Sequence, residues 1–270
     1  MNEIGKNQEY DDLIFSIKEA ETKLADLVYD RDQLIYHICP KIKTEYMLKI
    51  GKLEYAIFEY QCKILRIKRK IEIIQSFLNK EQVYNIAEID NDLDHEYQEY
   101  TKKLLEKQQE IEQAQFKNNN PGKLLSSEEA SELKNLYIQI VKKLHPDINP
   151  DTTEKQHDQF IDAVNAYEKA DLSELRIIFL LLEKTAVTET TGSMDKLKKR
   201  KESLLFEIDN MLDSIKKIHE TFPYNTKELL QNKELLKKEI DKSSAILTEK
   251  HEQLDELENH LEAMIKPTNE

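Results

Sequence analysis

Residues 46–74 read YMLKIGKLEYAIFEYQCKILRIKRKIEII, and this stretch predicts one long helix. Its apolar residues recur at alternating spacings of four and three, which is the heptad pattern of a coiled coil. They are Tyr46, Ile50, Leu53, Ile57, Tyr60, Ile64, Ile67, Ile71 and Ile74. Because such a stripe has to be buried against another element, the stretch predicts an all-α fold built on long coiled-coil helices.

The same spacing continues on both sides of this stretch. One apolar stripe runs from Tyr10 to Ile38, interrupted by the polar residues Glu21 and Arg31, and another runs from Ile86 to Ile111. Pro40 is expected to end one helix and begin the next, because proline lacks the N–H that a helix interior requires. Three helices packed together would bury these stripes, and a homodimeric coiled coil would bury them too.

The C-terminal part carries two more apolar stripes, from Leu197 to Ile218 and from Leu229 to Met264. Pro223 lies between them and stops the first helix, and Asn225 or Thr226 can cap the second. We therefore expect an antiparallel helical hairpin here.

Two polar breaks, at 118–122 and 185–193, divide the chain into three parts. The expected domains are a long-helix coiled-coil bundle at 1–117, a small helical module at 123–184 and the hairpin at 194–265.

Composition argues against several classes of protein. The formal net charge is −13 and each of the three parts is acidic, which argues against nucleic-acid binding. The four glycines are too far apart for a phosphate-binding loop, and the two cysteines form no pair that a zinc site or disulfide framework needs. No nucleophile, base and orienting group occur together. We therefore expect no enzyme activity, no cofactor and no metal.

The sequence also predicts a location. The N-terminal residues MNEIGKNQEYDDLIF lack the basic and apolar regions of a signal peptide. The longest apolar run, from Ile177 to Leu182, is far shorter than the roughly 20 residues that span a bilayer. The expected protein is soluble and cytoplasmic, without a membrane partner.

The central part contains a helix that ends at His145-Pro146-Asp147. Ser126 and Glu129 form a capping box at its start, and Pro146 ends it because a proline pushes the residue before it out of the α region. The next helix is expected to open with Asp151 and Glu154, and a short final helix covers 172–182. Since His145 cannot easily be helical, its ring and the Asp147 carboxylate are expected to project into solvent.

From Leu133 to Leu182 the chain resembles the J-domain family. The resemblance rests on a tyrosine eight residues before the histidine, a lysine pair, the His-Pro-Asp tripeptide, an Asn-Pro pair and a Phe-x6-Tyr spacing. These residues are Tyr137, Lys142, Lys143, His145, Pro146, Asp147, Asn149, Pro150, Phe160 and Tyr167.

The resemblance implies a co-chaperone that stimulates an Hsp70-type ATPase. By position, His145, Pro146 and Asp147 would contact that ATPase, with Lys142 and Lys143 as charge contacts. A second protein, the client or partner of unknown identity, would bind the long helices. The family's first helix has no clear counterpart before Ser126, so we expect its packing role to be taken by the N-terminal part.

Several alternatives stay open. Ile138 and Gln139 stand where the family is usually basic, which predicts modest stimulation. A structural coiled-coil scaffold with a degenerate J-like module is the rival function. The basic runs at 66–70 and 196–201 are interpreted as solvated faces, with binding of phosphate or an acidic partner as the less favoured interpretation. The Asp90-x-Asp92-x-Asp94 pattern is interpreted as a solvated acidic stretch and not as a calcium loop.

Overall fold

The computed structural model describes residues 2–120, 125–183 and 193–265. Over these ranges the regular structure is entirely helical, without a strand, and the all-α prediction is confirmed. The polar breaks at 121–122 and 185–192, and the expected domain boundaries at 123 and 184, lie outside the described residues. The chain forms two compact units, one of Met1–Lys41 with Gly122–Asn225 and one of Ile42–Pro121 with Thr226–Glu270.

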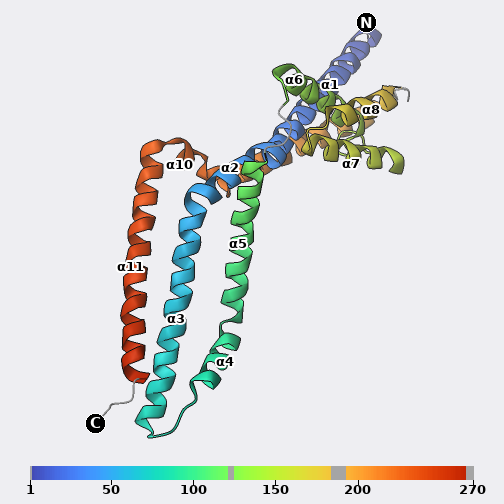
Figure 1. Cartoon of the computed structure of the whole chain (residues 1–270). Coiled ribbons are helices and arrows are strands. Elements are labelled where there is room, and N and C mark those ends of the chain that lie inside the picture. The colour runs from blue at the N-terminus through green and yellow to red at the C-terminus, as the bar shows by residue number, and fades with distance from the viewer. Residues whose placement is uncertain (1, 121–124, 184–192, 266–270) are drawn as a thin grey trace. The chain divides into compact units, whose positions relative to one another are not determined.

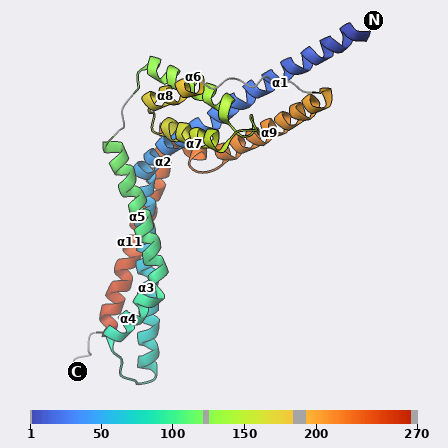
Figure 2. The same ribbon diagram turned by 90° about the vertical axis from the view of Figure 1, so that its right-hand side faces the viewer.

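In the first unit the N-terminal helix packs against the central module and against the first helix of the C-terminal part. Helix α1 (Asn2–Gln33) packs along α9 (Met194–Glu220) and also contacts α6 (Ser127–Leu144). Helices α6, α7 (Glu154–Glu168) and α8 (Leu172–Glu183) pack on one another (Figure 2). The N-terminal part thus supplies the packing partner that the central module was expected to need.

One large apolar core holds the first unit together, with residues from every one of its long helices. Its largest fully buried members are Ile17, Leu24, Tyr137, Ile140, Leu144, Ile148, Tyr167, Leu175 and Leu204.

The second unit is a layer of long helices around α3 (Lys52–Asn79). Helix α11 (Lys233–Ile265) lies along one side of α3 and α5 (Gln98–Asn119) lies along the other (Figure 1). Helix α4 (Ile86–Glu96) continues toward α5 and adds Ile89 and Leu93 to a small core around Ile74. A short helix, α10 (Lys227–Gln231), precedes α11.

These packing partners differ from the expected domains. The stripe of α9 packs on α1, and the stripe of α11 packs on α3, so 194–265 does not form a hairpin that buries itself. The 1–117 part likewise contributes to both units. The physical reason is that a heptad stripe requires a partner but does not identify it.

The expected helix end at Pro40 is wrong. Helix α1, η1 (Leu34–Ile38), α2 (Cys39–Tyr46), η2 (Met47–Gly51) and α3 follow one another without a break. Both η segments are π-helical, and the Cys39 N–H donates to the carbonyl of Leu34, five residues earlier. A π-turn changes the hydrogen-bond register locally, which lets the helix continue through a proline.

The helix starts were predicted in part. The Ser126–Glu129 capping box is present. Helix α7, however, begins with a capping box of Thr153 and Gln156 and not with Asp151 and Glu154. Helix α11 is capped by Asn232, whose side chain accepts from the N–H groups of Glu234 and Leu235.

Candidate functional site

The His-Pro-Asp loop joins α6 to α7 and is closed by its own hydrogen bonds. His145 has left the helix, with φ −64° and ψ 128°, although its N–H still donates to Val141 O at 2.9 Å. The N–H groups of Ile148 and Asn149 donate to the His145 carbonyl at 3.0 and 2.7 Å. The Asn149 amide donates to Lys142 O at 2.7 Å, so the loop also caps the end of α6.

The His145 ring lies inside the module. The residue is only 6% exposed, and the ring meets Phe160 of α7 edge to face at a centroid distance of 5.1 Å. Its Nδ1 accepts from the Asp147 N–H at 3.2 Å. The expectation that this ring projects into solvent is therefore wrong, because the loop folds back and turns the ring toward α7.

Burial also sets the charge of this histidine. It lowers the pKa of His145 below its ordinary value, although the nearby Asp147 carboxylate acts in the opposite direction. The Asp147 Oδ2 lies 3.8 Å from Nδ1. At neutral pH the ring is therefore uncharged and acts as a hydrogen-bond acceptor for the loop.

The other predicted site residues remain accessible. Pro146 is exposed, and 41% of the Asp147 side chain is exposed. Lys142 and Lys143 are half-buried on the last turn of α6, and the Lys143 Nζ lies 5.0 Å from the centroid of the Phe179 ring of α8. The structure thus brings the five residues together, with four at the surface and His145 beneath them.

A polar cluster lies under the module and involves α1. The Tyr137 hydroxyl donates to Asp32 Oδ2 at 2.5 Å, and the Tyr137 ring stacks on Tyr167 at 4.1 Å. Asp32 is 2% exposed and pairs with Arg31 at 2.6 Å. Burial, together with the Asp32 carboxylate, raises the pKa of Tyr137, so the phenol keeps its proton.

Arg200 of α9 is a second contact that the sequence did not reveal. Its guanidinium donates to the Ile148 carbonyl, directly after the tripeptide, and pairs with Glu21 of α1 at 3.3 Å. The loop is therefore joined to both long helices of its unit. The sequence held one indication of these contacts. Glu21 and Arg31 interrupt the N-terminal apolar stripe, and each of them takes part in one of the two polar clusters, with Arg200 and with Asp32 respectively.

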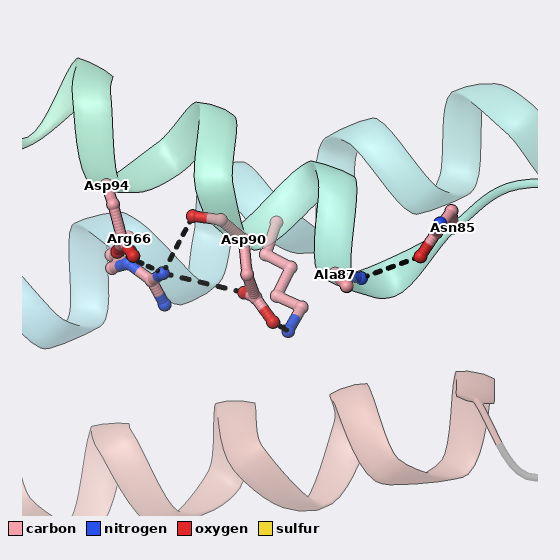
Figure 3. Close-up of polar contacts among 6 residues, drawn as sticks. Arg66, Asn85, Ala87, Asp90 and Asp94 are labelled. Carbon is pink, nitrogen blue, oxygen red and sulfur yellow. Dashed lines mark hydrogen bonds and ion pairs between the residues drawn. The ribbon is translucent and has the colours of Figure 1, made fainter.

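The acidic stretch of α4 is neutralised by α3. Arg66 contacts Asp94 at 2.7 Å and the Asp90 carboxylate at 3.5 Å, and Lys70 contacts Asp90 at 2.8 Å (Figure 3). The figure also shows Asn85 capping α4 through the N–H of Ala87.

Within the described ranges no group of His, Cys, Asp and Glu could hold a metal ion, and no described helix is long and apolar enough to cross a membrane.

Comparison with known proteins found no matching family model, no curated protein and no solved structure. The His-Pro-Asp loop is the part of the described chain that bears on function. It presents a hydrogen-bonded backbone, one carboxylate and two amines.

Proposed function

We propose that this protein is a J-domain-like co-chaperone or adaptor that recruits and stimulates an Hsp70-type ATPase through the His145-Pro146-Asp147 loop. The supporting observation is the form of this loop, which is held by the hydrogen bonds of His145 and Asn149 and leaves Pro146 and Asp147 accessible. A preorganised loop loses little conformational entropy when it binds.

In this proposal the protein performs no chemistry of its own. Asp147, Lys142 and Lys143 contact the ATPase, while His145 holds the loop from beneath. The bound loop shifts the ATPase toward its hydrolysing state by binding that state more tightly. The long helices of the second unit would bind the client, and the protein would act in the cytoplasm.

A structural scaffold with a degenerate J-like module is the second candidate. The burial of His145 and the Arg200 bond to Ile148 favour it, because both tie the loop into the body of its own unit. A scaffold would need the loop only as a rigid corner between α6 and α7.

Single-turnover ATP hydrolysis by the Hsp70-type chaperones of the same cell tests the proposal. Asp147→Asn removes one accessible charge and leaves the buried His145 ring in place. It should abolish stimulation of the ATPase, while the free energy of unfolding changes by less than about half a kcal/mol. Asp151→Asn is the matched control, since Asp151 is exposed in the same loop. If the full chain stimulates none of these ATPases, or if Asp147→Asn stimulates equally well, the scaffold function replaces the co-chaperone function.

A further inference from the structure

The two basic runs of the chain have different surroundings. The run at 66–70 lies against acidic side chains, because Arg66 and Lys70 pair with α4 (Figure 3) and Arg69 contacts Glu72 at 3.2 Å. Three of its four cations are therefore paired inside the second unit, and Lys68 is exposed. The run at 196–201, with sequence KLKKRK on the first turns of α9, has acidic partners for fewer of its cations among the described residues.

Within the described part of the chain, two of the five cations of the second run have acidic partners. Lys198 lies 3.5 Å from Glu9, and Arg200 pairs with Glu21. Lys196, Lys199 and Lys201 have no acidic partner among the residues that the structure describes. The first two are exposed, in a chain whose formal net charge is −13. A local positive surface on an acidic protein selects for a negatively charged partner.

The run lies beside the His-Pro-Asp loop. Arg200 donates to the Ile148 carbonyl, so the run contacts the loop through this residue. Lys142 and Lys143 adjoin it on the α6 side, and neither has an acidic partner within 2–120, 125–183 or 193–265. Two lysine-bearing helices, α6 and α9, therefore meet at one loop.

We propose that the 196–201 run of α9 and the Lys142–Lys143 pair form one composite docking surface for an acidic surface of the Hsp70-type ATPase. This inference rests on the proposed function and assigns a second helix to the same site. The run supplies positive charge that Ile138 and Gln139 do not supply on α6.

The charge pattern around the run fits an acidic protein surface better than a long polyanion. Asp195 comes directly before the run and Glu202 directly after it, with Glu207 further along α9. A nucleic acid carries one charge about every 3.4 Å along each strand, so it would soon meet these carboxylates. A compact acidic patch on a folded protein covers a shorter length of helix than a polyanion does, although Glu207 also acts on the His145 ring.

The deciding variant is Lys196→Gln with Lys199→Gln in the full chain. Neutral glutamines remove two charges without creating a new pair to Arg200, and both positions are exposed. A positive charge near the N-terminus of a helix interacts unfavourably with the helix dipole, so removing it does not weaken α9. The melting temperature should therefore not fall. The matched control is Lys233→Gln with Lys237→Gln, two exposed lysines on α11.

Binding of the cognate ATPase at several salt concentrations is the measurement. We expect the Lys196/Lys199 variant to bind about fivefold to tenfold more weakly at low salt, mainly through slower association, and the difference to shrink as salt rises. The control should match the unmodified protein. If ATP hydrolysis is stimulated but the variant binds as the unmodified protein does, the composite surface is overturned and the co-chaperone function stands.

A polyglutamate probe separates the surface from its assigned partner. If no Hsp70-type ATPase binds, the proposed function and the assigned partner both fail. In that case, if the Lys196/Lys199 variant binds polyglutamate more weakly than the unmodified protein does, the lysines still form a surface that binds acidic chains. If the two bind polyglutamate equally well, the proposed docking surface is overturned as well. Tighter binding of the run to RNA or to anionic vesicles than to polyglutamate would contradict the choice of a protein partner.

Discussion

His145 shows how one buried side chain connects loop shape with protonation. Its ring is packed against Phe160, and its Nδ1 accepts the Asp147 N–H, so the loop conformation depends on the neutral ring. Protonation would replace the acceptor lone pair with a donor and place a charge in an apolar setting. The carboxylates of Asp147, buried Asp32 and Glu207 favour the charged ring. Burial, together with the Arg31 guanidinium, outweighs them, so the pKa of His145 remains lowered.

The lowered pKa of His145 predicts how stability depends on pH. The folded state binds a proton at this ring less readily than the unfolded chain, whose histidine has its ordinary value of 6.5. The free energy of unfolding should therefore fall as pH drops below about 6.5 and continue to fall until the folded pKa is reached. His37, whose pKa is lowered by burial and by Lys41, acts in the same direction.

Urea unfolding of His145→Gln at pH 7.0 and 5.5 checks this. The substitution should cost about 1–3 kcal/mol at pH 7, because it removes a buried ring, and it should reduce the loss on acidification. His157→Gln, at an exposed position of α7, should change stability by less than about half a kcal/mol at both pH values. A pH dependence that is equally steep in His145→Gln would contradict the role of this ring.

The residues of the loop were predictable from sequence, but their exposure was not. Pro146 indicates a helix end through its own covalent geometry, whereas the direction of the His145 ring depends on Phe160, fifteen positions further along the chain. Asp32 and Arg200 were missed for a similar reason, since their partners Tyr137 and Ile148 are distant in sequence.

At the scale of the element, apolar spacing predicted the buried residues of α9, whereas Ile35 and Tyr100 on two other stripes are exposed. On α9, Leu204 and Met211 are 0% and 6% exposed, and Ile215 is partly buried against the same core. The neighbouring Leu205 is 46% exposed, as its place one residue off the stripe requires. Helix interruptions were harder to predict, because a π-turn accommodates Pro40 without a sequence signal.

The α9 stripe provides a matched pair of substitutions. Leu204→Ala should destabilise the protein by about 2–5 kcal/mol, because it leaves a cavity in the core of the first unit. Leu205→Ala removes the same atoms from an exposed site and should cost less than about half a kcal/mol. Chemical denaturation of the two variants measures the difference, and equal losses would contradict the packing of α9 on α1.

At the scale of the whole molecule, each unit combines two distant stretches of chain. Five apolar stripes indicate the long helices, but they do not say that α1 packs with α9 or that α3 packs with α11. Stripes of similar composition can pair in several ways, and the choice depends on polar contacts such as Glu21 with Arg200. The helical class was therefore predictable from the sequence, and the division into units was not.

This division predicts how the chain behaves when it is cut. Fragments 1–183 and 193–270, expressed together, should form a one-to-one complex, because α9 completes the core of the first unit and α11 completes the layer around α3. Fragment 193–270 alone should lose much of its helicity, since isolated helices with exposed apolar stripes are marginal in water. Light scattering and circular dichroism measure both. If 193–270 were fully helical by itself and did not bind 1–183, these helices would pack as an independent hairpin and the two-unit arrangement would be wrong.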